Sequence, residues 1–451
     1  MFRVESCTRK SIVSRSRDGF AGAIGDTPHI VLPKLSAALG RTIVGKAEFL
    51  NPGGSVKDRA TRGIVDDAER TGRLRPGGII VEGTAGNTGI ALTLIANARG
   101  YRAIIVVPDD QSPEKIGLLR TYGADVREIP AVPFANPENY YHVARRIAEE
   151  TPHAVWADQF NNTANRRAHY ETTGPEIWND FGERLTAFVA ACGTGGTLAG
   201  TATYLKERDD AVRIVLCDPF GSALFDYVTR GTLDVEGDSN AEGIGIKRIT
   251  ENFAGAPVDD AVRVDDRSMV EMAYWLLREE GLYVGGSAAL NVVGAARVAA
   301  TLPEGSTVVT ILCDGGERYR SRLWNPAWLA ENDCTPAATD LSSYRIIDGR
   351  PYRPHARDVV RVQSPLVRRL VGDGDGIRRL DRDRNGASGR ARQTAPAARR
   401  RRRSRNFDRS AANSKRRTHA RCLLRRATRR RTEDACRRRR ASHLGRGRAI
   451  A

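Results

Sequence analysis

The sequence predicts an α/β protein with doubly wound, mostly parallel sheets over about its first 330 residues. Short β-rich runs alternate there with longer helical patterns, which is typical of parallel strands joined by crossover helices. Two of the runs, AIIVVP and VVTILC, are almost continuously apolar, as strands covered on both faces are. The chain has 451 residues, 40% of them hydrophobic, so it can bury a sizeable core, and its length favours two or more domains.

The predicted elements follow one another in a regular order. Strands are expected at 42–49, 78–82, 103–108, 187–192, 214–218 and 307–313. Helices are expected to begin at Ser55 and to follow Asn87, Ser112, Asn139, Thr197 and Ser268. This alternation places successive strands in parallel and helices on both faces of each sheet.

Charge divides the chain into two parts. Residues 350–451 contain 33 Arg, one Lys and eight acids, net +26, whereas the first 349 residues carry 38 basic and 46 acidic side chains, net −8. We predict that 350–451 is disordered, because dense like charge with few large apolar residues cannot offset conformational entropy. Two interpretations of this tail stay open. It is either an arm that binds nucleic acid or another polyanion, or a segment without selected function. The second interpretation fits a frameshifted or read-through end, because a shifted reading frame of GC-rich DNA encodes mainly Arg, Ala, Gly and Pro.

The cysteines and the apolar pattern bear on the compartment. The seven cysteines are odd in number and scattered, with no C-x-x-C pair and no histidine at metal-ligand spacing, which favours a reducing compartment and no metal. No run of about 18 uncharged apolar residues occurs, and the N-terminus lacks the apolar stretch of a secretory signal. We therefore expect a soluble, cytoplasmic protein without membrane contact.

The segment NPGGSVKDRAT at 51–61 ends a predicted strand and opens a helix. Ser55 and Asp58 form an S-x-x-D capping pattern, which places Lys57 in the first helical turn. The positive end of the helix dipole favours the neutral amine that a Schiff base requires. Taken alone, a lysine in such a position is more often a solvated surface residue, so the neighbouring motifs decide its interpretation.

Two glycine-rich turns link predicted strands to predicted helices. VEGTAGNTG, at 81–89, presents small residues and N–H groups that suit an anion such as a carboxylate, although a plain turn capped by Asn87 fits the pattern as well. CGTGGTLAG, at 192–200, offers backbone amides and two threonine hydroxyls to a phosphate. It has neither the lysine of a nucleotide P-loop nor the G-x-G-x-x-G dinucleotide pattern, which favours a phosphate monoester.

Six motifs occur in the order found in cysteine synthases: NPGGSVKDR, EGTAGNTG, QFNNTANRRAHYETTGPEIW, GTGGTLAG, AEGIG and GGSAALN. Over 24–329 the chain therefore resembles this family of pyridoxal-phosphate enzymes of fold type II, whose fold is tryptophan synthase β-like. The resemblance implies a larger phosphate-binding domain at 24–50 and 164–330. It also implies a smaller, mobile domain at 51–163, which carries the Schiff-base lysine and the substrate-carboxylate loop. Residues 1–23 are expected to form a flexible N-terminus before the first part of the larger domain.

The resemblance assigns roles to particular residues. Lys57 matches the catalytic lysine that binds pyridoxal 5'-phosphate, Asn87 the asparagine at the cofactor's 3′-oxygen, and Ser287 the serine that faces the pyridine nitrogen. The implied phosphate cup is Gly193, Thr194, Gly195, Gly196 and Thr197. The implied substrate-binding residues are Thr84, Ala85, Gly86, Asn87, Thr88, Gln159 and Gly243.

The reaction implied by the resemblance is a β-replacement in a homodimer. It makes L-cysteine from O-acetyl-L-serine and sulfide through an α-aminoacrylate intermediate. Two alternatives to this reaction stay open. The first is the β-replacement of a cystathionine β-synthase or serine sulfhydrylase, because these enzymes share the motifs. The second is a catalytically altered scaffold with a nucleic-acid-binding tail. Ala85 replaces the family's usual serine, and Ala288 and Ala289 replace Ser-Gly after Ser287, so donor and acceptor preference is left open.

Overall fold

The structure is a computed structural model that describes residues 17–336. The predicted tail at 350–451 and residues 1–16 of the predicted flexible N-terminus lie outside the described residues. Residues 17–23 are described and include the short helix α1 (Gly19–Gly22). Beside it, Arg62 donates hydrogen bonds to the carbonyl oxygens of Ala21 and Ile24, at 3.3 and 2.9 Å, so this segment is attached to the helix that begins at Lys57.

The larger sheet has six strands in the order β1-β2-β10-β7-β8-β9. They are β1 (His29–Val31), β2 (Thr42–Ala47), β7 (Leu185–Ala191), β8 (Arg213–Pro219), β9 (Asp260–Val264) and β10 (Thr307–Leu312). β1 pairs antiparallel with β2, with His29 opposite Lys46, and every other neighbouring pair is parallel. Strands that are distant in the sequence thus lie side by side, which only crossover connections allow.

The smaller sheet has four parallel strands in the order β5-β4-β3-β6. They are β3 (Ile79–Gly83), β4 (Arg102–Pro108), β5 (Asp125–Ile129) and β6 (Ala154–Trp156). All of its strands come from the range 51–163, and the strands of the larger sheet come from the ranges on either side of it. The division into a fixed and a mobile domain stays a prediction.

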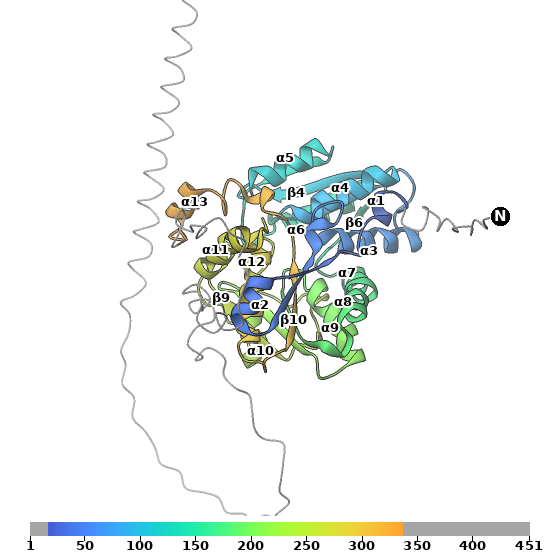
Figure 1. The fold of residues 1–451 in the computed structure, drawn as a ribbon. Helices are drawn as coiled ribbons and strands as arrows, with labels where there is room; N and C mark the ends of the chain where they lie inside the picture. Colours follow the sequence, from blue (N-terminus) through green and yellow to red (C-terminus); the bar gives the residue numbers. More distant parts are fainter. Residues whose placement is uncertain (1–16, 337–451) are drawn as a thin grey trace, which may run out of the picture. The chain divides into compact units, whose positions relative to one another are not determined.

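Helices cover both faces of each sheet (Figure 1). The smaller sheet packs on one face against α3 (Lys57–Arg70), α4 (Asn87–Arg99), α5 (Pro113–Thr121) and α7 (Ala164–Ala168), and on the other against α6 (Tyr140–Glu150). The larger sheet packs on one face against α2 (Pro33–Leu39), α11 (Asp266–Trp275), α12 (Gly286–Ala299) and α13 (Pro326–Glu331). Its other face packs against α8 (Gly174–Phe181), α9 (Gly196–Arg208) and α10 (Leu224–Arg230).

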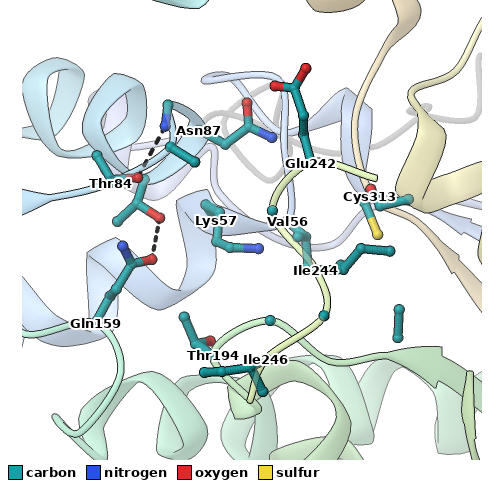
Figure 2. Close-up of a pocket in the computed structure, with 18 of the residues that line it drawn as sticks. Val56, Lys57, Thr84, Asn87, Gln159, Thr194, Glu242, Ile244, Ile246 and Cys313 are labelled. Atoms are coloured by element: carbon teal, nitrogen blue, oxygen red, sulfur yellow. Dashed lines mark hydrogen bonds between the residues drawn. The ribbon is translucent and has the colours of Figure 1, made fainter. Parts of the chain in front are cut away.

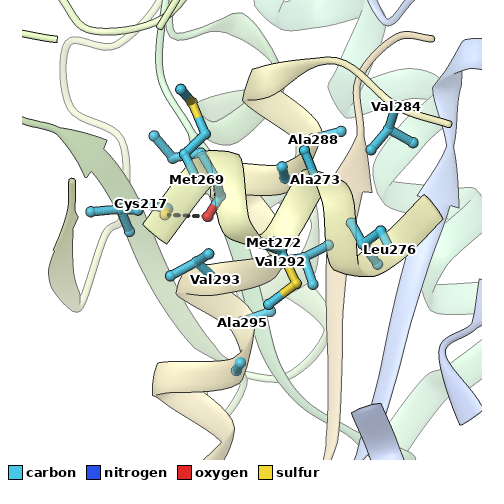
Figure 3. Packing of buried hydrophobic residues seen from close by; sticks show 14 of the residues in the cluster. Cys217, Met269, Met272, Ala273, Leu276, Val284, Ala288, Val292, Val293 and Ala295 are labelled. Atoms are coloured by element: carbon cyan, nitrogen blue, oxygen red, sulfur yellow. Dashed lines mark hydrogen bonds between the residues drawn. The ribbon is translucent and has the colours of Figure 1, made fainter. Parts of the chain in front are cut away.

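The core follows from the two-residue period of the strands. In β7, Val189 belongs to the cluster under α11 and α12, while Phe188 belongs to the cluster under α8 and α9. Figure 3 shows Met272 of α11 and Val292 of α12 packed against each other over this sheet. Because apolar side chains leave both faces, the central strands read as continuous apolar runs. The predicted α/β class with mostly parallel sheets is confirmed.

All six predicted strands are present, with ends within two residues of those expected, whereas β1, β5, β6 and β9 were not predicted. These four are the edge strands of the two sheets. Edge strands are short or partly solvated, so their sequences lack the apolar run that marks a central strand. Among residues 17–336, no helix is both long and apolar enough to cross a membrane.

Candidate active site

A cavity of about 440 Å³ collects residues that follow β3, β6, β7 and β10, the carboxyl ends of strands from both sheets. In open α/β sheets, ligands bind in this kind of crevice. Every residue that the resemblance assigned to the site lines the cavity except Gly196. These lining residues are Lys57, Thr84, Ala85, Gly86, Asn87, Thr88, Gln159, Gly193, Thr194, Gly195, Thr197, Gly243 and Ser287.

Lys57 is the first residue of α3, and its side chain points into the cavity (Figure 2). Gln159 lies on one side of the Lys57 side chain and Cys313 on the other. The backbone before the lysine is tied to the larger sheet, because the Val56 N–H donates to the Cys313 carbonyl oxygen, 2.8 Å away and directly after β10. Lys57 is therefore held where the strand ends of both sheets meet.

The predicted capping box at this helix does not form. Asp58 Oδ2 accepts the N–H of Gly53 at 2.5 Å, and Ser55 Oγ accepts the N–H of Lys57 at 3.3 Å. The Gly53–Gly54 turn folds back over the helix start, so the carboxyl group meets Gly53 instead of the Ser55 N–H. Burial raises the pKa of Asp58 to about 7. Asp58 thus fixes the turn that precedes Lys57.

The turn between β7 and α9 offers hydrogen-bond donors at a helix start. Gly195 has φ of +92°, and a Cβ there would lie 2.6 Å from Cβ of Phe253, so the turn requires glycine. Thr194 Oγ1 accepts from Nδ2 of Asn165 at 2.9 Å, which leaves the hydroxyl proton free to donate. Among the described residues, Thr194 and Gly195 give their backbone N–H to no protein group. Such a helix N-terminus suits a phosphate monoester.

Thr197, in the first turn of α9, is oriented by a buried histidine. His169 Nε2 lies 3.1 Å from Thr197 Oγ1, and its Nδ1 lies 2.9 Å from Thr173 Oγ1. Burial, reinforced by the charge of Arg59, lowers the pKa of His169 to about 3. The neutral imidazole therefore acts as a hydrogen-bond partner that sets the rotamer of Thr197.

The loop after β3 brings backbone and hydroxyl groups to the cavity. Gly86 has φ of +139°, and a Cβ there would lie 2.5 Å from Cδ of Lys115, so only glycine fits. The Gly86 N–H donates to Thr84 Oγ1 at 3.1 Å, which closes the loop on itself before α4 begins (Figure 2). Ala85 lines the cavity at the position of the missing hydroxyl.

Gln159 is held on three sides by the protein. Its Oε1 accepts from Thr88 Oγ1 at 2.6 Å, and its Nε2 donates to Glu82 Oε1 and to the Gly83 carbonyl oxygen, both at 3.1 Å. Burial, reinforced by the charge of Asp158, raises the pKa of Glu82 well above its ordinary value. A substrate carboxylate that binds the Gln159 amide therefore has to replace Glu82 or Gly83 as its partner.

Asn87 is also fixed by side chains from the segment that follows β10. Its Nδ2 donates to Asp314 Oδ2, and its Oδ1 accepts from Nη1 of Arg318, each at 2.6 Å. Asp314 is fully buried and also accepts from the Tyr319 hydroxyl at 2.6 Å. One Nδ2 hydrogen of Asn87 remains for a ligand oxygen.

Ser287 stands in the first turn of α12 and lines the cavity together with Cys313, whose thiol accepts from Nδ2 of Asn291 at 3.4 Å. Burial raises the pKa of Cys313 to about 12, so both groups are neutral at physiological pH. This side of the cavity therefore presents neutral polar atoms, in agreement with a serine opposite a ring nitrogen.

The loop that carries Gly243 is tied across the cavity by charges. Glu242 accepts from Lys115 of α5 at 2.6 Å and from Arg322 at 3.1 Å. Lys115 Nζ lies 4.2 Å from the centroid of the Tyr319 ring. Lys115, Glu242 and Tyr319 line the cavity, and none of them was among the predicted site residues. Glu242 lies in the AEGIG motif next to Gly243, whereas Lys115 and Tyr319 come from segments outside the quoted motifs.

Gly196 lies behind the turn. A Cβ there would lie 2.0 Å from Asn165 Oδ1, so glycine lets Asn165 reach both Thr194 Oγ1 and the Gln159 carbonyl oxygen, each at 2.9 Å. Ala288 and Ala289 are fully buried in the core of the larger sheet, so these two departures from the family pattern affect packing.

The lysine, the free donors of the turn and the neutral serine fit a cofactor that combines an aldehyde, a phosphate monoester and a ring nitrogen. Residues 20–314 match the family model described as pyridoxal-phosphate dependent enzyme. The fold and the site thus define an enzyme of the pyridoxal-phosphate-dependent class.

Comparison with named relatives narrows this class. The chain is 52% identical to cysteine synthase 1 of Neurospora crassa over 335 residues, covering 73% of this chain and 89% of the relative. It is 54% identical to cysteine synthase 1 of Emericella nidulans over 317 residues, or 69% and 86% of the two chains. The crystal structure of an O-acetylserine-dependent cystathionine β-synthase from Helicobacter pylori is 37% identical, with a TM-score of 0.62 over 67% of this chain and 97% of that one. The chain therefore belongs to the cysteine synthase family.

Proposed function

We propose that this enzyme makes L-cysteine by exchanging the β-substituent of O-acetyl-L-serine for sulfide. The observation on which the proposal rests is that one cavity joins the Lys57 amine, the loop at 84–88 and the turn at 193–197. The cysteine synthases among its relatives support the choice of donor and acceptor.

When bound, pyridoxal phosphate supplies an electron sink next to the substrate Cα. Lys57 would hold it covalently, the turn around Thr194 its phosphate, Ser287 its ring nitrogen, and Asn87 its ring oxygen. The loop at 84–88 and Gln159 would take the substrate carboxylate and so place Cα against Lys57.

Lys57 is then the base. Once the substrate amine has displaced it, the neutral Nζ accepts the Cα proton and the acetate leaves from Cβ. The sulfur nucleophile adds at Cβ, and Lys57 Nζ returns the proton to Cα. Cys313 has too high a pKa to compete as an acid or base near neutral pH.

Donor and acceptor assays test this proposal. The purified full chain should form L-cysteine from O-acetyl-L-serine and sulfide with a kcat/KM at least about tenfold above that for L-serine with either sulfide or L-homocysteine, a gap of roughly 1.4 kcal/mol. A higher value for L-serine would assign the cystathionine β-synthase or serine sulfhydrylase alternative. No turnover with any pair, together with salt-sensitive nucleic-acid binding that is lost on truncation at residue 340, would favour the altered scaffold.

Three finer statements belong to the same proposal. We propose a homodimer and a cytoplasmic location, and for the Arg-rich segment at 350–451 either contact with a polyanion or no selected function. Light scattering, imaging of a fluorescent fusion and a salt-dependent binding assay with the full chain test them in turn.

A further inference from the structure

Arg248 lines the cavity from the loop that follows Gly243. Its guanidinium lies 4.2 Å from the ring centroid of Phe134, 4.8 Å from that of Phe160 and 5.2 Å from that of Tyr141. The side chain is half-buried and lines the cavity. Three rings from the segments around α6 and β6 thus hold an arginine that belongs to another part of the chain.

Arg248 is not paired with an acid in the described part of the chain. Among residues 17–336, its guanidinium makes no hydrogen bond, and no carboxylate lies within 4.0 Å of it. Asp158, whose charge acts on it, is engaged with the Tyr141 hydroxyl and the Asn161 side chain. Glu242, an acid that lines the cavity, is paired with Lys115. Burial lowers the pKa of Arg248 and outweighs the more distant charge of Asp158.

Such an arginine is prepared to bind an anion. Stacking on aromatic rings restricts the guanidinium before a ligand arrives, so less entropy is lost on binding, and its N–H donors lie at the edge of the plane, away from the rings. A guanidinium needed only for packing would gain more from a carboxylate partner or from an uncharged replacement.

The chemistry of the reaction indicates which anion binds there. The cofactor phosphate and the substrate carboxylate are already allotted to the turn at 193–197 and to the loop at 84–88. Two anions remain, the departing acetate and the incoming acceptor, since sulfide is largely hydrosulfide at mildly alkaline pH. Of these two, only the acceptor has to be bound for the second half-reaction. It enters after the leaving group has departed, and Gly243 and Lys247 on the Arg248 loop are exposed to solvent.

We propose that Arg248 is a specificity-determining residue that binds the anionic acceptor of the second half-reaction, either hydrosulfide or a thiol that carries a carboxylate. This inference rests on the proposed β-replacement. It assigns to Arg248 a role in choosing the nucleophile, separate from cofactor and donor binding.

Steady-state kinetics of the cofactor-loaded full chain test the assignment. The donor is O-acetyl-L-serine, and the acceptors are sulfide, 3-mercaptopropionate and 2-mercaptoethanol. The two organic thiols share the HS–CH2–CH2 unit, and the first ends in a carboxylate whereas the second ends in an uncharged hydroxyl group. In a ping-pong reaction, kcat/KM for the acceptor reports the second half-reaction and kcat/KM for the donor reports the first. The variants are Arg248→Gln, Arg248→Lys, and Lys247→Gln as a control that removes one charge from the same loop.

We expect Arg248→Gln to lower kcat/KM for sulfide and for 3-mercaptopropionate about tenfold, as loss of a charged hydrogen bond does. The values for 2-mercaptoethanol, for the donor and for Lys247→Gln should stay within about twofold, and Arg248→Lys should restore most of the loss. A fall with 3-mercaptopropionate alone would identify a carboxylate-bearing thiol as the acceptor. If the parent enzyme uses neither organic thiol, the test is whether Arg248→Gln lowers kcat/KM for sulfide while kcat/KM for the donor stays unchanged.

Three results for Arg248→Gln would overturn the assignment and leave Arg248 a packing residue. They are an equal fall in kcat/KM for all acceptors, a matching fall in kcat/KM for the donor, or an unchanged kcat/KM for both sulfide and 3-mercaptopropionate. Failure of the proposed function looks different, because the parent enzyme would then turn over no donor and acceptor pair at all.

Discussion

Replacing Arg59 with Met should lower the free energy of unfolding by about 3–5 kcal/mol, because Arg59 is buried and pairs with two carboxylates, of which Glu48 is buried as well. Its guanidinium donates to Glu48 at 2.8 and 2.9 Å and to Glu176 at 2.6 and 2.7 Å. The side chains of Arg59 and Glu48 are both 0% exposed. Arg59 also lies two residues after Lys57, so this network supports the start of α3.

The magnitude follows from what Met leaves behind. Burial by itself would raise the pKa of Glu48, but the charge and hydrogen bonds of Arg59 outweigh it and hold the pKa below its ordinary value. Without Arg59, Glu48 becomes a buried carboxylate with a lost partner, the situation that costs about 3–5 kcal/mol in other proteins. Loss of the pair with Glu176 adds less to the change in the free energy of unfolding. Glu176 is 20% exposed, and it retains its ion pair with Lys46, whose Nζ lies 2.7 Å from its carboxylate oxygen.

Urea unfolding of the full chain, followed by circular dichroism, measures the effect. Arg70→Met is the matched control in the same helix, because Arg70 is 66% exposed and pairs with Asp67, and it should cost less than about 1 kcal/mol. Adding Glu48→Gln to Arg59→Met should recover part of the loss, since it removes the unpaired charge. The reasoning is refuted if Arg59→Met costs no more than Arg70→Met.

Two further predictions concern the phosphate turn. Gly196→Ala should raise the dissociation constant of pyridoxal phosphate about tenfold in a fluorescence titration, because the added Cβ displaces Asn165. The control variant Gly117→Ala should leave the dissociation constant unchanged, because its Cβ meets nothing within 4 Å. Equal affinities of the two variants would contradict the proposed fit of the phosphate to the turn. His169 takes up its proton near pH 3 when folded and near 6.5 when unfolded, so below pH 6.5 the unfolded state binds more protons. The contribution of His169 to the free energy of unfolding is complete above pH 6.5 and should fall by up to about 1.4 kcal/mol per pH unit towards pH 3, as measured by urea titration at each pH. The variant His169→Gln should lack this pH-dependent part. Equal slopes of the free energy of unfolding against pH in the two proteins would refute the assignment.

The sequence predicts central strands well and edge strands poorly. In β4 and β10 both faces are buried, so apolar residues are continuous and the pattern is local. In β5, with the sequence DVREI, no residue is fully buried, and the strand exists because β4 offers its free backbone groups. Pairing of this kind depends on tertiary structure and leaves little trace in the edge strand itself.

The same distinction applies to the site. Lys57, the loop at 84–88 and the turn at 193–197 were predictable because each is one short motif whose glycines and hydroxyls have a local reason. His169, Asn165 and Arg248 were not, because their roles depend on partners that the fold brings from other segments. The capping box failed for a related reason: the Gly53 N–H competes for the Asp58 carboxyl group.

The measurement that tests the central claim most directly is borohydride reduction of the purified, cofactor-loaded chain, followed by peptide mapping and a visible absorption spectrum. We expect the reduced cofactor on the peptide that contains Lys57, and a visible band that is absent from Lys57→Ala. A label on a different lysine, or no label and a colourless protein, would contradict the account.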